Sequence, residues 1–190
     1  MHPDYKQPSF YHFDEDSTSL AKIASKEYPN AKKVLDLCAG SGVVGLEYCL
    51  NNNVKIIHFN ELQVQFEEIL LSNIELVNSV ESKVIIDDFR KASLESYDLI
   101  LCNPPYFKKG DGRVSSDSQK QVCRTFETGS SVELIQTILK SLNPGGMGVI
   151  VYPYNLNHWK ECKEKFKENI KVLQRSGKVE FSLIIKSDLN

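Results

Sequence analysis

The hydrophobic positions of the chain follow two alternating patterns. Short runs of consecutive apolar residues, typical of buried strands, are separated by longer segments in which apolar residues recur every three or four positions. The runs predict strands at residues 32–37, 55–60, 83–86, 97–102 and 148–152. The periodic segments predict a first helix, which Asp16 and Ser17 cap and which ends before Pro29, and further helices at residues 44–50, 63–77, 131–142 and 156–169.

The order of these elements predicts the fold. Strands alternate with helices, which favours a mainly parallel sheet covered by helices on both faces, with ligands bound outside the C-terminal ends of the strands. The last two extended segments, residues 171–175 and 179–186, are joined at Ser176 and Gly177, which suit a tight antiparallel turn. We therefore expect an α/β fold: a Rossmann-like, seven-stranded, mainly parallel sheet with helices on both faces and a C-terminal antiparallel hairpin.

Length and composition favour one main domain. The chain has 190 residues, of which 41% are hydrophobic, enough for a core that needs no disulfide bonds. We expect a lead-in and helix over residues 1–30 and a single α/β domain over residues 31–190. The chain has five cysteines, an odd number, and no two of them form a C-x-x-C pair. This pattern suggests neither a disulfide framework nor a zinc site, and it indicates a reduced intracellular protein. No signal peptide and no apolar run of membrane-spanning length are found, so we predict a cytoplasmic monomer with no membrane partner and no metal.

The first predicted strand runs into a glycine-rich turn, DLCAGSGVVG at residues 36–45. Gly40, Gly42 and Gly45 form G-x-G-x-x-G at a strand-to-helix junction, where glycine allows a tight turn and a close approach of the backbone to a ligand. Glu61 follows Gly40 by 21 residues, at the end of the next strand, where a carboxylate can accept hydrogen bonds from ribose hydroxyls. This part of the pattern fits NAD as well as other adenosine cofactors.

Asp36 and the residues after the third strand narrow the choice of cofactor. A carboxylate that faced a pyrophosphate would repel it by about 1–4 kcal/mol, whereas it would attract the ammonium and sulfonium of S-adenosylmethionine. The alternative is an ordinary strand-to-helix turn with a capping aspartate. Asp88 is placed to accept from an adenine amino group, and Phe89 to stack on the ring or donate its backbone N–H, unless Asp87 and Asp88 form a plain solvated turn.

The fourth predicted strand leads into the sequence NPPYF at residues 103–107. Prolines lack an N–H donor and leave carbonyl acceptors exposed. The side-chain carbonyl of Asn103 and the backbone carbonyl of Pro104 can then accept from one planar –NH₂ group, which aims the nitrogen lone pair at a methyl donor. Tyr106 offers a face on which a base can stack, a contact worth about 1–3 kcal/mol. A simple proline turn is the alternative; otherwise Asn103, Pro104, Pro105 and Tyr106 are the predicted catalytic residues.

These motifs resemble a known family. DLCAGSG, Glu61 and NPPYF are similar to those of class I S-adenosylmethionine-dependent methyltransferases that modify adenine N6, cytosine N4 or a glutamine amide. FDEDSTSLA at residues 13–21, NPPYF and CRTFE at residues 123–127 most resemble the bacterial tRNA(Val) adenine-N6 methyltransferases. The resemblance implies S-adenosyl-L-methionine as cofactor and the following residues as its contacts: Asp16, Ser17, Asp36, Ala39, Gly40, Gly42, Glu61, Leu62, Asp88, Phe89 and Asn103.

Three alternatives share parts of this pattern. Ribosomal RNA guanine-N2 methyltransferases have a similar glycine turn but usually carry Asp in place of Asn103. Release-factor glutamine methyltransferases share N-P-P-Y and usually carry an additional N-terminal helical domain, for which the residues before the first strand leave no room. A non-catalytic RNA- or cofactor-binding module is a rival from another class, and the intact sequence at residues 103–106 argues against it.

The distribution of charge favours an RNA substrate. The net charge is −2, but residues 107–178 contain 13 basic and 7 acidic residues, and the rest of the chain contains 10 basic and 18 acidic residues. Cations in the stretch after the NPPYF sequence would contact phosphates without reading the sequence. The lysine-rich segment at residues 156–169 fits a solvated helix face at least as well. We therefore predict methylation of an exocyclic amine, most simply adenine N6 of a tRNA, with the substrate bound by Tyr106, Phe107, Lys108, Lys109, Arg113 and Arg124.

Overall fold

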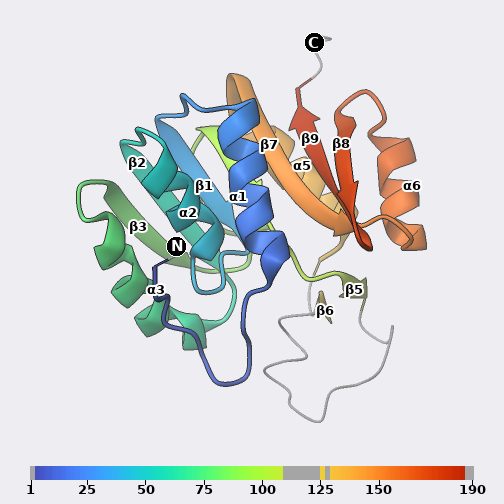
Figure 1. Ribbon diagram of the computed structural model, residues 1–190. Helices are drawn as coiled ribbons and strands as arrows, with labels where there is room; N and C mark the ends of the chain where they lie inside the picture. Colours follow the sequence, from blue (N-terminus) through green and yellow to red (C-terminus); the bar gives the residue numbers. More distant parts are fainter. Residues whose placement is uncertain (1–2, 109–124, 127–128, 187–190) are drawn as a thin grey trace.

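A computed structural model describes residues 3–108, 125–126 and 129–186 (Figure 1). Its centre is a seven-stranded sheet in the order β3-β2-β1-β4-β7-β9-β8. The neighbours from β3 to β7 are parallel, and β9 is antiparallel to both β7 and β8. In chain order the strands of this sheet are β1 (Lys33–Leu37), β2 (Ile56–Glu61), β3 (Glu81–Ile86), β4 (Tyr97–Cys102), β7 (Leu142–Pro153), β8 (Ile170–Ser176) and β9 (Val179–Ile185).

Helices cover both faces of this sheet (Figure 1). Two further strands, β5 (Phe107–Lys108) and β6 (Thr125–Phe126), pair with each other in a separate small sheet. The helical segments are α1 (Glu15–Glu27), α2 (Val43–Asn51), η1 (Val64–Phe66), α3 (Glu67–Ile74), η2 (Glu75–Val77), α5 (Ser131–Ser141) and α6 (Asn157–Lys165). The predicted fold class is confirmed.

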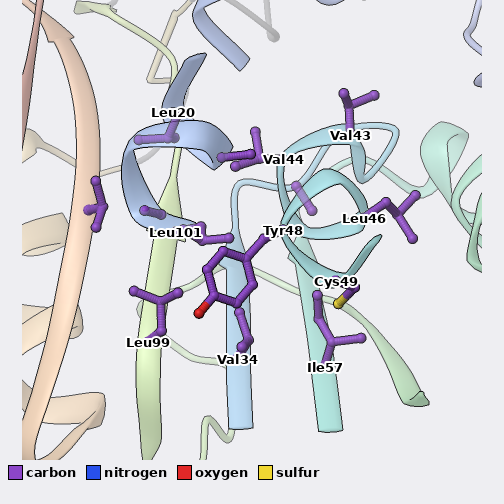
Figure 2. Packing of buried hydrophobic residues seen from close by; sticks show 14 of the residues in the cluster. Leu20, Val34, Val43, Val44, Leu46, Tyr48, Cys49, Ile57, Leu99 and Leu101 are labelled. Carbon is purple, nitrogen blue, oxygen red and sulfur yellow. The ribbon is translucent and has the colours of Figure 1, made fainter. Parts of the chain in front are cut away.

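The sheet separates two hydrophobic cores because successive strand residues point to opposite faces. On one face α1, α2 and α3 pack on the sheet, and the ring of Tyr48 lies among Val34, Leu99 and Leu101 (Figure 2). On the other face α5 and α6 pack on Leu35 and its neighbours. In the part of the chain that the structure describes, no helix is long and apolar enough to cross a membrane.

The topology brings the C-terminal ends of β1, β2, β3, β4 and β7 to one edge of the sheet, which we call the C-terminal edge. The turn of the β8–β9 hairpin lies at this edge too. Because β9 runs antiparallel to β7, Val179 at its start pairs with Pro153 at the end of β7. Ser176 at the end of β8 pairs with the same Val179.

Several predicted boundaries are wrong. The N-cap of α1 is Asp14, whose carboxylate accepts from the backbone N–H of Asp16 at 3.1 Å, so Asp16 and Ser17 lie inside the first turn instead of capping it. Asp14 takes this role because its backbone is extended, which is the conformation that an N-cap requires. The predicted helix at residues 63–77 is divided into η1, α3 and η2. The helix predicted to reach residue 169 ends at Lys165, and the strand predicted at residues 148–152 begins at Leu142.

Candidate active site

A pocket lies at the C-terminal edge of the sheet, where the fold predicts ligands to bind. It holds about 870 Å³, part of it open to solvent. Its wall is formed by Tyr11 and Phe13 before α1, Ser17 in α1, residues 38–41 after β1, Val43 and Val44 in α2, residues 60–63 and Phe66 at and after β2, residues 87–89 after β3, and Asn103 and Pro105 after β4. The predicted cofactor residues Ser17, Ala39, Gly40, Glu61, Leu62, Asp88, Phe89 and Asn103 are therefore brought together in one wall.

The three glycines of the turn have different roles. A Cβ at Gly42, whose φ is +81°, would lie 2.4 Å from Cδ1 of Leu70, and one at Gly45 would lie 2.8 Å from Cδ1 of Ile57. These two glycines let α2 pack closely on the core, and neither is part of the pocket wall. Gly40 is part of the wall, with a φ of +54° that favours glycine. Gly40 therefore lies where a close approach to a ligand is possible, whereas Gly42 lies outside the pocket wall.

Asp36 lies below the turn rather than in the pocket wall. Its side chain is buried, and its Oδ2 accepts from the backbone N–H of Gly45 at 2.8 Å. Its Oδ1 has no hydrogen-bond partner among the described residues. Burial raises the pKa of Asp36 to about 8, against the opposing effect of the Gly45 hydrogen bond. A protonated carboxyl would not supply the charge on which the predicted attraction of the sulfonium rests.

Glu61 connects the glycine turn to the end of β2. Its Oε2 accepts from the backbone N–H of Gly40 at 2.8 Å, and its Oε1 accepts from the backbone N–H of Gln63 at 2.9 Å. Burial raises the pKa of Glu61, although the hydrogen bonds from Gln63, Gly40 and Leu62 act in the opposite direction. A carboxylate has about four acceptor positions, so these three hydrogen bonds leave Glu61 able to accept one more from a hydroxyl group in the pocket.

Asp88 is paired with the neighbouring Arg90, which the sequence did not lead us to expect. Oδ1 of Asp88 accepts from Nε of Arg90 at 3.0 Å, and Oδ2 accepts from Nη2 at 2.6 Å. Arg90 also lies 3.5 Å from a carboxylate oxygen of Glu133 in α5. Arg90 therefore fixes the orientation of the Asp88 carboxylate. Asp88 and the neighbouring Phe89 are both largely buried and belong to the pocket wall.

Asn103 is held by residues from two distant parts of the chain. Its Nδ2 donates to Oγ of Ser17 at 3.1 Å, and its Oδ1 accepts from the hydroxyl of Tyr106 at 2.8 Å. Because Ser17 is the partner of the amide nitrogen, the carbonyl oxygen of the side chain is fixed as the acceptor. Asp16, which was predicted to contact the cofactor together with Ser17, is not part of the pocket wall, and burial raises its pKa.

Tyr106 lies next to the pocket without forming part of its wall. Its ring centre is 5.5 Å from that of Tyr152, and its backbone carbonyl accepts from Nε2 of His158 at 3.1 Å. The hydroxyl of Tyr152 lies 3.1 Å from the same Nε2. Tyr152 and His158 thus hold the segment after Asn103 from the face of the sheet that α5 and α6 cover. Sequence reasoning missed both residues because neither belongs to a recognisable motif.

Asn73 was also missed. It joins the segment before α1 to the glycine turn, since its Oδ1 accepts from the backbone N–H of Lys6 and its Nδ2 donates to the carbonyls of Lys6 and Ser41, each at 2.9 Å. The segment is fixed again where Tyr5 donates to Glu47 at 2.6 Å. These contacts hold the chain that carries Tyr11 and Phe13 to the pocket.

The structure describes three of the six predicted substrate-binding residues, namely Tyr106, Phe107 and Lys108. Lys109, Arg113 and Arg124 lie outside the described residues. Phe107 and Lys108 form β5, whose backbone pairs with β6. Their contacts with a substrate stay predictions.

Comparison with solved structures shows that the fold is that of the class I methyltransferases. A 16S rRNA N2 methyltransferase of Thermus thermophilus, solved in complex with AdoMet and guanosine, has a TM-score of 0.68 at 20% identity, over 94% of this chain and 45% of that chain. The structure of PH1948 from Pyrococcus horikoshii, described as a candidate RNA methyltransferase, has a TM-score of 0.68 at 17% identity, over 97% of this chain and 92% of that chain.

The chain belongs to the methyltransferase small domain family, whose model matches residues 9–181. A tRNA1(Val) (adenine(37)-N6)-methyltransferase of Shewanella sp. (strain W3-18-1) is 30% identical over 142 residues, which is 68% of this chain and 57% of the relative. A release factor glutamine methyltransferase of Borreliella burgdorferi is 24% identical over 146 residues, which is 73% of this chain and 50% of the relative. The chain thus spans between half and three fifths of the length of these relatives.

Proposed function

We propose that the protein transfers a methyl group from S-adenosyl-L-methionine to an exocyclic amino nitrogen, with adenine N6 of a tRNA as the acceptor. The observation that carries the proposal is the side chain of Asn103, which lies in the pocket wall with its amide nitrogen bound to Ser17. This leaves Oδ1 as an acceptor beside two prolines, which have no N–H to offer. Such a site suits a ligand group that donates hydrogen bonds, and an exocyclic –NH₂ group is one.

The pocket wall fits S-adenosylmethionine. The pocket lies at the C-terminal edge of the sheet, which is where open α/β sheets bind their ligands. Glu61 is placed to accept from ribose hydroxyls, Asp88 and Phe89 to hold the adenine, and the backbone at Gly40 to allow close approach. When bound, S-adenosylmethionine supplies an electrophilic methyl group. Asp36, which lies below the wall, supports the glycine turn through Gly45 instead of contacting this ligand.

The residues after β4 are placed to position the amine. Oδ1 of Asn103 and the backbone carbonyl of Pro104 accept from the two N–H bonds of the substrate, which directs the nitrogen lone pair away from both acceptors. Positioning of this kind supplies much of the rate enhancement of a bimolecular transfer. A strong general base is not required, because the proton can leave the nitrogen after methylation. The hydroxyl of Tyr106, which donates to Oδ1 in this structure, gives up or shares that acceptor when the substrate amine binds.

Two observations support an RNA acceptor. The relative from Shewanella is a tRNA methyltransferase, and the stretch from residue 107 to residue 178 carries a net charge of +6. Glutamine methylation is the second candidate, because the relative from Borreliella modifies a release factor and the cofactor wall would be the same for both substrates. Asn103 favours either of these over guanine-N2 methylation, for which we expect Asp at this position.

A labelled methyl-transfer assay tests the proposal. Unmodified tRNA, ribosomal RNA and total protein from cells that lack the gene are each incubated with the protein and S-adenosylmethionine carrying a labelled methyl group. We expect label in tRNA, in N6-methyladenine after digestion, and a loss of at least about 100-fold in kcat for Asn103→Ala. Label in protein alone would favour the glutamine substrate, and transfer by Asn103→Ala at the wild-type rate would refute the role of Asn103.

A further inference from the structure

The basic residues at the end of the β8–β9 hairpin lie on the same edge of the sheet as the candidate active site. Arg175 and Lys178 flank the hairpin turn, and this turn is level with Pro153 at the end of β7. Lys160 lies in the first turn of α6, which begins just after β7. Figure 1 shows the hairpin turn and the start of α6 towards the end of the sheet where β5 lies. We call Lys160, Lys163, Arg175 and Lys178, together with Tyr154, the basic edge.

A buried carboxylate organises this surface. Glu180 in β9 is completely buried, and its Oε1 accepts from Nε1 of Trp159 at 2.8 Å and from Nζ of Lys163. Its Oε2 accepts from Nε of Arg175 at 3.2 Å. Although burial raises it, the pKa of Glu180 is lowered overall by the hydrogen bonds from Lys163, Trp159 and Arg175. Glu180 is therefore ionised and holds two cations in fixed positions.

Arg175 remains available to a ligand in spite of this bond. Its guanidinium uses Nε to bind Glu180 and lies 4.8 Å from the ring centre of Tyr154, while 59% of its side chain is exposed. Arginine held in this way loses little conformational freedom on binding, and its planar group matches the geometry of a phosphate. Two further cations of the basic edge, Lys160 and Lys178, are also exposed.

The opposite half of the C-terminal edge is acidic. Glu61, Asp87 and Asp88 belong to the pocket wall at the ends of β2 and β3, where Arg90 pairs with Asp88. A polyanion would be repelled from that half and attracted to the hairpin half.

We infer that the basic edge binds the phosphate backbone of the RNA that flanks the target base, so that the RNA runs from the segment after Asn103 towards the β8–β9 hairpin. The inference rests on the proposed function and adds to it the side on which the RNA leaves the pocket. An acidic protein segment would be attracted by the same charges. We favour RNA because an arginine fork beside an aromatic ring is suited both to phosphates and to unpaired bases.

The test compares two double variants that remove the same charge. Arg175→Gln with Lys178→Gln alters the basic edge, whereas Lys165→Gln with Lys167→Gln alters two exposed lysines, one at the C-terminal end of α6 and one just after it. Binding of an unmodified tRNA(Val) transcript is measured by fluorescence anisotropy at several salt concentrations, and the KM for methylation of the same transcript is measured in parallel. Binding of S-adenosylmethionine serves as the control for folding.

We expect the edge variant to weaken tRNA binding roughly tenfold and to reduce the slope of log K against log salt by about 0.7 to 0.9 for each phosphate that the variant no longer binds. Its KM for tRNA should rise with little change in kcat, and the far-end variant should behave like the wild type. Equal effects of the two variants, or no effect of either, would overturn the inference about the basic edge. The proposed function would still stand in that case, provided that the wild type methylates tRNA. A wild type that methylates only protein would overturn both.

Discussion

The side chain of Asn103 donates from Nδ2 to Oγ of Ser17 at 3.1 Å, although the two residues are 86 positions apart in the chain. Ser17 belongs to α1 and Asn103 follows β4, so the contact connects the helix before the sheet to the residue that we expect to bind the amine. Both side chains lie in the wall of the same pocket. We therefore expect Ser17 to act as a positioning residue, because its hydrogen bond fixes which end of the Asn103 amide faces the ligand.

Removal of the Ser17 hydroxyl should therefore impair catalysis more than binding. In Ser17→Ala the amide of Asn103 loses the partner of its nitrogen and can rotate, so we expect kcat to fall about five- to tenfold, the cost of one hydrogen bond. The dissociation constant of S-adenosylmethionine should change by a smaller factor. Steady-state methylation of tRNA and calorimetric titration measure the two quantities. Ser17→Thr, which keeps a hydroxyl, should recover most of the rate; a failure to do so would indicate a packing role for Ser17.

Tyr106 should act on the substrate and not on the cofactor. Its hydroxyl binds Asn103, but its ring lies outside the pocket wall, where a base that enters beside Asn103 can stack on it. Tyr106→Ala should raise the KM for tRNA by about 5- to 150-fold, which corresponds to about 1–3 kcal/mol for one stacked base. Tyr106→Phe retains the ring and should have a KM near that of the wild type.

Binding of S-adenosylmethionine to these two variants is the control for Tyr106. Both should bind it as the wild type does, as judged by calorimetric titration. An equal loss of cofactor and substrate binding in Tyr106→Ala would contradict the stacking role and would show that the substitution disturbs the whole pocket.

The sequence predicted those parts of the fold and site that depend on local patterns. The buried run at residues 97–102 matches β4 without change, and the turn at Gly177 joins β8 and β9 as expected. Pocket residues that end a strand, such as Glu61 and Asn103, were found because parallel strands deliver their C-terminal residues to one edge.

Contacts between distant segments could not be read from the sequence. Nothing near Asn73 or His158 marks them as partners of Lys6 and Tyr106, because those hydrogen bonds depend on how separate elements pack. Asp36 shows the limit of a motif in another way. Its position in the turn is characteristic, but its charge state depends on burial, which only the structure shows. Gly42 likewise has a packing role, which spacing alone did not distinguish from contact with a ligand.

Asn73 should control how firmly the segment before α1 covers the pocket. Its side chain is buried and makes three hydrogen bonds that join Lys6 and Ser41. Asn73→Ala leaves those backbone groups without a partner, so we expect a loss of about 1–3 kcal/mol in the free energy of unfolding, as is usual for a buried group left unsatisfied. We also expect weaker binding of S-adenosylmethionine, because Tyr11 and Phe13 of this segment lie in the wall of the pocket that we expect to bind it.

Hydrogen exchange distinguishes a local effect of Asn73 from a general loss of stability. In Asn73→Ala the amides of residues 5–13 should exchange faster, while those of β1 and β4 remain protected at pH values where the protein is folded. A matched control is Asn52→Ala, whose side chain binds Ser25 and the carbonyl of Tyr48 away from the pocket wall. If Asn52→Ala weakens cofactor binding as much as Asn73→Ala does, the connection between Asn73 and the pocket is refuted.

Asp36 should make the stability of the protein fall as the pH rises through neutrality. Its pKa in the folded protein is raised from 3.8 to about 8, mainly by burial. At a pH between these values the unfolded chain loses the proton of Asp36 while the folded protein retains it, so the contribution of this group is complete below about pH 4 and decreases up to about pH 8. The slope cannot exceed about 1.4 kcal/mol per pH unit, the value for one proton.

The variant Asp36→Asn tests this prediction, because its side chain cannot ionise and its amide oxygen can still accept from the backbone N–H of Gly45. We therefore expect the free energy of unfolding of the wild type, minus that of Asp36→Asn, to decrease between about pH 5 and about pH 8 in urea titrations followed by circular dichroism. A difference that increases with pH would show instead that Asp36 is ionised in the folded protein and is stabilised by the N–H of Gly45 at the start of α2.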